Sequence, residues 1–164
     1  MLEKNTFFNI AFSVDNVIFG LEDSVLKVLL IKRKQDPFKD EWALPGELVY
    51  PDEDLDDAPK RVLEEMTGLT DVYLEQVHTF GKVDRHPRGR VITVAYYSLV
   101  NMQALNPKAA AQAKSVKWFN VFDIKKLPFD HHKILQSCVE QLQKSVKVHP
   151  IGFGLLPEKF TLSD

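Results

Sequence analysis

Residues 44–69 constrain the fold of this chain more than any other part of the sequence. They read LPGELVYPDEDLDDAPKRVLEEMTGL and combine a Pro-Gly turn, an acidic loop and one helical pattern in a fixed order. Asp52 or Asp54 can cap the helix, and the acidic residues that follow suit the positive end of its dipole. Gly68 is a good terminator just past the last helical residue. We therefore predict a helix over residues 55–67, preceded by a tight turn.

The remaining residues predict several strands and two further helices. The predicted strands cover residues 10–19, 25–31, 42–44, 72–83, 91–100 and 116–120, and the further helices cover 121–127 and 130–146. We expect Gly20 to end the first strand, and the first two strands to form a hairpin. The last helix carries one apolar face, made by Ile134, Leu135, Cys138, Leu142 and Val146. Strands that alternate with two long helices, residues 55–67 and 130–146, favour a mixed α/β sandwich.

The composition is that of one globular domain. A length of 164 residues suits a single buried core. No apolar run reaches the roughly 18 to 20 residues that a membrane span needs, and the first residues lack the pattern of a secretory signal. Cys138 is the only cysteine, which excludes an internal disulfide and suggests a reduced, buried thiol. We expect a cytoplasmic protein without membrane contact.

The charge balance argues against direct binding of nucleic acid by these residues. The formal net charge is −2 and the isoelectric point is about 6.2. A domain that grips nucleic acid by itself usually carries a basic excess or a basic stripe. Any contact with DNA would therefore need a small surface, a dimer or a part of the protein outside this domain.

The segment 44–69 resembles the box of the Nudix hydrolase superfamily, G-x5-E-x7-R-E-U-x-E-E-x-G-U, in which U is a bulky aliphatic residue. Aligned on Gly68, the pattern is matched by Glu53, Arg61 and Glu65, and also by its two aliphatic positions. The resemblance implies the Nudix fold, an α/β/α sandwich with a mixed sheet. It also implies cleavage of a diphosphate linked to another group, with Mg²⁺ or Mn²⁺ held by box glutamates.

Three positions depart from this pattern. Glu47 replaces the first glycine, and Val62 and Met66 replace two glutamates. Residues 62 and 66 lie four apart, so both point from one helix face, which continues the apolar stripe of Leu55 and Ala58. A hard divalent ion prefers several anionic oxygen ligands, so we predict no competent metal site. What remains is a Glu53–Arg61 ion pair and a weak metal remnant at Glu53 and Glu65.

Two other segments resemble bacterial Nudix-related transcriptional regulators. They are residues 80–97, FGKVDRHPRGRVITVAYY, and residues 150–162, PIGFGLLPEKFTL. Such regulators join a Nudix-like sensor to a C-terminal winged helix-turn-helix, and they respond to ADP-ribose-type metabolites or to a sugar such as arabinose. The resemblance implies a Nudix-like domain over 1–149, and a linker with the start of a DNA-binding domain over 150–164. The pattern Thr161-Leu-Ser-Asp164 resembles a helix cap, although an ordinary tail explains it equally well.

The regulator resemblance makes Arg85, Arg88 and Arg90 candidate ligand contacts, with Arg33 as a further candidate. Arginine suits phosphate because its planar fork donates two hydrogen bonds at once. The alternative is a solvated hairpin loop, and a neutral sugar effector would weaken the argument. Trp42 could stack on a ligand or belong to the core. The pair His131-His132 could suggest a metal site, but adjacent helical residues cannot easily chelate one ion. We therefore expect both residues to lie on the surface at a helix N-terminus.

Two functions stay open at this stage. The first is an effector-binding domain, needing no cofactor, that senses an ADP-ribose-like nucleotide or a sugar. As a regulator it would form a homodimer and reach DNA only through the C-terminal domain, because paired recognition helices match two half-sites. The second is a hydrolase of a nucleoside diphosphate derivative, requiring Mg²⁺ or Mn²⁺ at an atypical site built from Glu47, Glu53 and Glu65.

Overall fold

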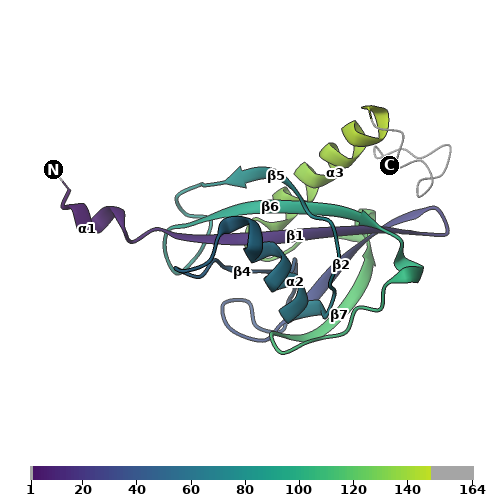
Figure 1. Ribbon diagram of the computed structural model, residues 1–164, viewed down its shortest axis with the longest axis horizontal. Helices are drawn as coiled ribbons and strands as arrows, with labels where there is room; N and C mark the ends of the chain where they lie inside the picture. Colours follow the sequence, from purple (N-terminus) through teal and green to yellow (C-terminus); the bar gives the residue numbers. More distant parts are fainter. Residues whose placement is uncertain (1, 149–164) are drawn as a thin grey trace.

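The computed structural model describes residues 2–148, which form a mixed sheet with a helix on each face (Figure 1). The strands are β1 (Ala11–Glu22), β2 (Val25–Arg33), β3 (Trp42–Ala43), β4 (Gly46–Leu48), β5 (Glu75–Phe80), β6 (Val91–Val100) and β7 (Ala113–Asn120). The helices are α1 (Lys4–Phe7), α2 (Ala58–Thr67) and α3 (His131–Val148), with 3-10 turns η1 (Leu55–Asp57), η2 (Met102–Ala104) and η3 (Val121–Asp123). The predicted α/β/α sandwich with a mixed sheet is confirmed.

Strand β1 is the centre of the sheet. It pairs in parallel with β6 over residues 11–20 and 91–100, and antiparallel with β2 and β4. The strand order is β3-β2-β1-β6-β5, with β4 paired to β1 and β7 paired to β2. Because β1 has neighbours on both edges and helices over both faces, its middle residues are buried on both sides. The side chains of this strand therefore reach both layers of the core.

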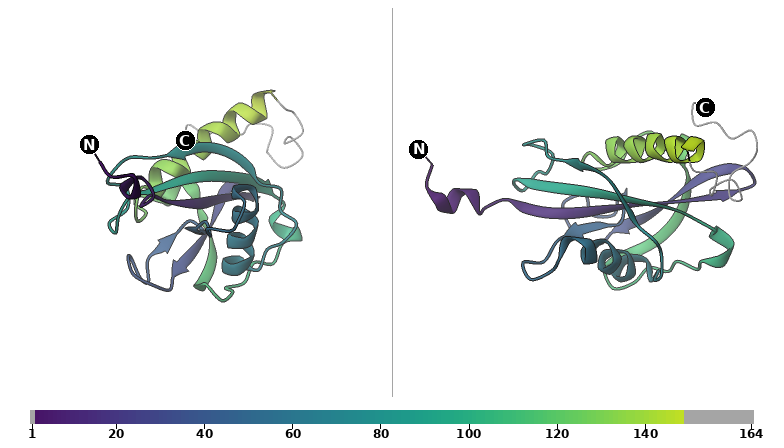
Figure 2. Two further views of the ribbon diagram at one scale, coloured as in Figure 1. Left: turned by 60° about the vertical axis from the view of Figure 1, so that its left-hand side comes forward. Right: turned by 45° about the horizontal axis from the view of Figure 1, so that its top comes forward.

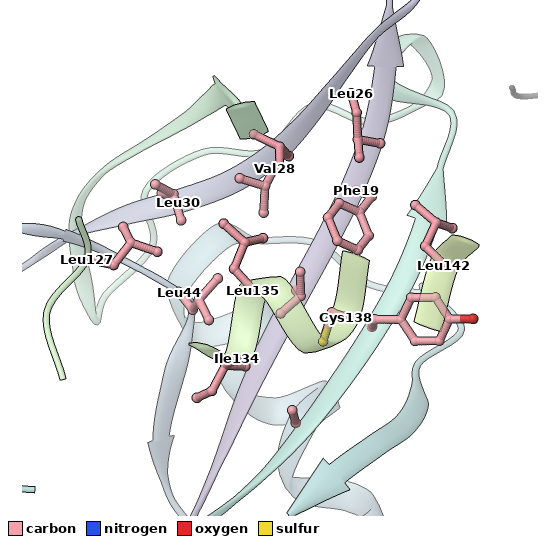
Figure 3. Packing of buried hydrophobic residues seen from close by; sticks show 14 residues of the cluster. Phe19, Leu26, Val28, Leu30, Leu44, Leu127, Ile134, Leu135, Cys138 and Leu142 are labelled. Carbon is pink, nitrogen blue, oxygen red and sulfur yellow. The ribbon is translucent and has the colours of Figure 1, made fainter. Parts of the chain in front are cut away.

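Helix α3 closes one face of the sheet, as its apolar periodicity predicts. Ile134, Leu135, Cys138 and Leu142 lie against Phe19 of β1 and the apolar residues of β2 (Figure 3). Burial raises the pKa of the Cys138 thiol to about 12, so this cysteine remains protonated and unreactive. The side chain of Val146, predicted on the same face, lies outside the described residues.

Helix α2 closes the opposite face and contains the second half of the box. Ala58, Val62 and Met66 are buried together with Val14 and Ile31 of the sheet. The predicted stripe is confirmed at these three positions. The fourth, Leu55, is 37% exposed, because the first predicted turn is the 3-10 turn η1 and the α-helix begins only at Ala58. A proline in the first turn of α2 costs no intrahelical hydrogen bond.

The first hairpin is longer than predicted. Strand β1 continues through Gly20 to Glu22, and the chain reverses at Asp23 and Ser24, both with positive φ, as in the tight turns that suit twisted hairpins. Gly20 does not end the strand. It lies against the Met102 side chain, which would clash with a Cβ atom at this position, so its role is close packing.

Other boundaries differ more modestly. Strand β5 covers only the middle of the predicted 72–83, β7 begins earlier than residue 116, and η3 is shorter than the predicted helix 121–127. Strand β4 was not predicted; it forms because residues 46–48 pair with Ser13, Val14 and Asp15. The predicted linker at 150–164 lies outside the described residues. Among residues 2–148, no helix is both long and apolar enough to cross a membrane.

Truncation of the α3 face should test its contribution to stability. Leu135→Ala should lower the free energy of unfolding by about 2–5 kcal/mol, because the substitution leaves a cavity beneath α3. Gln136→Ala, at the exposed position beside it, should change stability by about 0.5 kcal/mol or less. Urea unfolding followed by circular dichroism measures both, and equal effects would contradict the packing described.

Candidate functional site

The four arginines predicted as ligand contacts, Arg33, Arg85, Arg88 and Arg90, all line one cavity. Its volume is about 430 Å³, which is within the range of small-molecule sites. Its lining residues come from the end of the sheet where β1 and β6 begin, from β4 and from the hairpin loop that joins β5 to β6. Figure 2 shows how these strands and the loop are arranged in the fold. The tertiary structure therefore brings together residues from distant parts of the sequence.

A buried carboxylate, Asp15 of β1, forms the floor of this cavity. It is 4% exposed. The Thr93 hydroxyl donates to its Oδ2 atom at 2.6 Å, and the His131 Nε2 atom lies 3.1 Å from its Oδ1 atom. Burial raises the pKa of Asp15, but His131, Thr93 and the nearby Arg85 together outweigh it and hold the pKa below 3.8. The cavity floor therefore carries a permanent, compensated negative charge.

His131 is buried, so the prediction of a surface position was wrong. The backbone N–H of Leu44 donates to His131 Nδ1 at 3.1 Å. Because Nδ1 accepts this bond, the proton belongs on Nε2, which donates to Asp15. The first residue of α3 thus joins β1 to the turn before β4. No local sequence signal reveals this, because the two partners come from distant segments.

Arg85 is committed to protein partners. Its Nε and Nη2 atoms donate to the two carboxylate oxygens of Asp130 at 2.9 and 2.7 Å, and its Nη1 atom donates to the Val91 carbonyl at 3.3 Å. Its side chain is 3% exposed. This bidentate pair holds the hairpin loop against the start of α3. The predicted contact of Arg85 with ligand stays a prediction, and the geometry gives the residue a structural position.

Arg33, Arg88 and Arg90 are more accessible. The Arg33 guanidinium lies 5.0 Å from the centre of the Phe129 ring, and its Nε atom donates to the Pro37 carbonyl at 2.7 Å. Burial lowers the pKa of Arg33 from its ordinary value, but Glu47 and Asp15 oppose this, and the side chain stays charged at neutral pH. Within residues 2–148, the Arg88 and Arg90 side chains take part in no ion pair. These three cations can reach an anion in the cavity.

An aromatic wall completes the cavity. The rings of His86 and Phe129 stack at 5.1 Å with an interplanar angle of 25°. His86 Nδ1 accepts a hydrogen bond from the Arg88 backbone N–H at 3.1 Å. Burial, followed by the charges of Arg85, Arg33 and Arg88, lowers the pKa of His86, so its ring is neutral at neutral pH. Sequence reasoning missed this wall because neither residue has a recognisable partner along the chain.

The remaining box glutamates share one guanidinium. Arg61 contacts Glu53 at 2.6 and 2.9 Å and Glu65 at 3.0 Å, and it donates to the Leu48 carbonyl at 2.9 Å. The predicted Glu53–Arg61 ion pair is confirmed. The hydrogen bond from Arg61 is the main cause that lowers the pKa of Glu53.

The box of this chain does not fit a catalytic divalent ion. Both carboxylates expected to hold metal are already paired with Arg61, and Val62 and Met66 offer no oxygen atom. Among the described residues, no group of three or more His, Cys, Asp or Glu side chains could hold a metal ion. Weak metal binding at Glu53 and Glu65 stays a prediction.

Trp42 belongs to the periphery of the core. Its ring packs edge-on against Phe119 at 5.0 Å, beside the cluster that α3 covers, and it does not line the arginine cavity. Of the two interpretations of Trp42, the core position is therefore the one the structure supports. His132 is half-buried on α3 and lies outside this cavity.

Comparison with known proteins identifies relatives over most of the chain. A family profile described as NUDIX domain matches residues 11–138. An ADPR responsive transcriptional repressor, NtrR, of Acinetobacter baylyi is 34% identical over 99% of this chain, and the chain spans 66% of that protein. An ADP-ribose pyrophosphatase of Methanocaldococcus jannaschii is 36% identical over 71% of this chain and 68% of its own length.

Two solved structures of a Shewanella protein are also similar to this chain. The NUDIX domain of Shewanella oneidensis NrtR, complexed with ADP ribose, is 33% identical, with a TM-score of 0.77 over 86% of this chain and 94% of that domain. The same Shewanella protein, complexed with a 27mer DNA, is 35% identical, with a TM-score of 0.72 over 92% of this chain and 70% of that protein. A homologue of this chain therefore binds both ADP-ribose and DNA.

Removal of the buried charge should test the cavity floor. Asp15→Asn should lower the free energy of unfolding by about 3 kcal/mol at neutral pH, because Arg85 and His131 lose a buried negative partner. The folded-state pKa of Asp15 lies below 3.8, so its charged form stabilises the fold above that pH. The difference from wild type should be complete above about pH 5 and should shrink as the pH falls below 3.8.

Urea unfolding at several pH values measures this difference. The matched control is Asp84→Asn, because Asp84 is an exposed carboxylate of the same hairpin loop, and it should change stability by about 0.5 kcal/mol or less. A difference between Asp15→Asn and wild type that does not depend on pH would contradict the assignment.

Proposed function

The chain belongs to the Nudix family, and on that premise we propose that its domain binds an ADP-ribose-type nucleotide as an effector and does not hydrolyse it. The observation that carries the proposal is the contrast between two sites. The arginine cavity presents Arg33, Arg88 and Arg90 to a small molecule, whereas Val62 and Met66 occupy the metal-binding face of the box helix.

The chemistry of the cavity favours a nucleotide over a sugar. Arginine forks match phosphate oxygens in charge and in geometry. The stacked rings of His86 and Phe129 offer a flat surface for a base or a ribose. A neutral pentose would bring no negative charge to match the three accessible cations. For this reason a sugar effector such as arabinose is the less favoured ligand.

The box argues against rapid hydrolysis. In the family's reaction a divalent ion neutralises phosphate charge and orients or activates the attacking water, an effect worth several kcal/mol. At about 1.4 kcal/mol for each factor of ten, its loss lowers the rate by orders of magnitude. The hydrophobic face formed by Val62 and Met66 is closed into the core, so a small side-chain movement cannot create an ion site there.

The similarity to the Acinetobacter and Shewanella regulators supports a role in transcription. The chain spans 66% of the Acinetobacter repressor, so the DNA-binding part of such a protein would lie beyond the described domain. The net charge of −2 agrees with a domain that does not hold DNA by itself. We propose that the whole protein acts as a homodimer that contacts DNA through a separate C-terminal domain.

A second candidate function is hydrolysis of ADP-ribose, which the similarity to the Methanocaldococcus pyrophosphatase favours. It would require Mg²⁺ or Mn²⁺ at a site built from Glu47, Glu53 and Glu65. Arg61 would have to release Glu53 and Glu65 for this to occur. The intact ion-pair cluster makes this the weaker proposal.

Calorimetry with ADP-ribose tests the binding proposal. Arg88→Ala and Arg90→Ala should each weaken binding about tenfold or more, because a charge-assisted hydrogen bond contributes roughly 1.5–3 kcal/mol. Lys144→Ala, which removes an exposed cation of α3 outside the cavity, should leave the affinity unchanged. Binding of arabinose in place of ADP-ribose would reject the nucleotide, and equal losses in all three variants would reject the site.

An activity assay tests the absence of hydrolysis. Wild type incubated with ADP-ribose and Mg²⁺ or Mn²⁺ should release AMP no faster than a protein-free control, because the box lacks two of its glutamates and Arg61 holds Glu53 and Glu65. Glu65→Gln should give the same result. Metal-dependent turnover in wild type that Glu65→Gln abolishes would establish the hydrolase instead.

A further inference from the structure

The accessible charges of the arginine cavity are of both signs. Asp15 and Arg85 are buried and already have partners, which leaves Arg33, Arg88 and Arg90 as the accessible cations. Opposite charge comes from two exposed side chains, Asp36 in the loop after β2 and Glu47 on β4. A site meant only for phosphate would have no need for exposed carboxylates, because each one repels the ligand.

Glu47 is the better placed of the two. Strand β4 is fixed by pairing with β1, where Glu47 lies opposite Val14. The backbone N–H of Leu48 donates to Glu47 Oε1 at 2.9 Å, which holds the carboxylate near the strand. Among the charges that raise the pKa of Arg33, Glu47 has the largest effect. Glu47 and Arg33 line the same cavity, and the Glu47 carboxylate stabilises the charged form of Arg33.

The charge count restricts the ligand. Three accessible cations and two carboxylates leave a net charge of only about one positive, so each further negative charge on a ligand is less well compensated. A diphosphate esterified at both ends, as in ADP-ribose, carries two. A nucleoside diphosphate with a free terminal phosphate, as in ADP, carries about one more charge near pH 7, since the second ionisation of a phosphate occurs near pH 6. A triphosphate carries still more.

We infer that Glu47 determines the charge selectivity of this cavity, admitting a doubly esterified nucleoside diphosphate and disfavouring nucleoside di- and triphosphates that end in a free phosphate. The inference rests on the proposed function and deepens it by naming the residue that excludes competing nucleotides. The mechanism is repulsion between the Glu47 carboxylate and the additional phosphate charge. It also gives a role to the glutamate that stands where the Nudix box has glycine.

Calorimetry with wild type and Glu47→Gln tests the inference, using ADP-ribose, ADP and ATP as the three probes. Wild type should bind ADP-ribose more tightly than ADP or ATP. Glu47→Gln should bind ATP at least about tenfold more tightly than wild type does, whereas its affinity for ADP-ribose should change less than about threefold. The gain for ATP should shrink as salt is raised from about 0.05 to 0.5 M, because salt screens exposed charges. A purely structural effect would not depend on salt in this way.

Glu75→Gln is the matched control, because it removes an exposed carboxylate of β5 outside the cavity, and it should leave all three affinities unchanged. If wild type binds ADP-ribose and Glu47→Gln has the same preference among the three nucleotides, the role of Glu47 is rejected while the proposed function stands. If wild type does not bind ADP-ribose at all, the proposed function itself is rejected.

Discussion

The burial of one carboxylate, Asp15, is the constraint on which the rest of this structure depends. A charge in the middle of a central strand is costly unless each of its oxygen atoms finds a partner. The partners come from three other elements: Thr93 from β6, His131 from α3 and Arg85 from the hairpin loop. The same carboxylate also leaves no room for a side chain at Gly46, where β4 passes beside it. One buried charge thus fixes how the sheet, α3 and the hairpin loop meet.

This arrangement gives the three arginines of the hairpin loop two different kinds of position. Arg85 is held by Asp130 and supports the wall, while Arg88 and Arg90, a few residues further along the same loop, face the cavity without ion pairs in the described part of the chain. Because Arg85 anchors the loop to Asp130, the positions of Arg88 and Arg90 are restricted before the proposed ligand binds. Such preorganisation lowers the entropic cost of binding. One loop therefore contributes Arg85 to the structural network and Arg88 and Arg90 to the candidate binding surface.

The box helix reflects a different balance. Each buried Val or Met side chain contributes roughly 1.5–3 kcal/mol of hydrophobic stabilisation. Val62 and Met66 gain it by packing under β1 and β2, where carboxylates would need a metal ion as partner. Arg61 meanwhile ties the preceding loop to the helix through Glu53, Glu65 and the Leu48 carbonyl. The box keeps its shape through packing and ion pairs, although it lacks two of the glutamates that the family's metal chemistry uses.

The sequence by itself determined those features that depend on near neighbours. The spacing of residues 44–69 identified the family, and the periodicity of residues 130–146 identified the buried face of α3. The four arginines were also found from sequence, through resemblance. Only the tertiary structure decided that they share one cavity, that Gly20 continues a strand, and that His131 turns inward to Asp15. The physical reason is that hydrophobic periodicity and turn chemistry act over a few residues, whereas a buried hydrogen-bond network joins residues that only the folded sheet brings together.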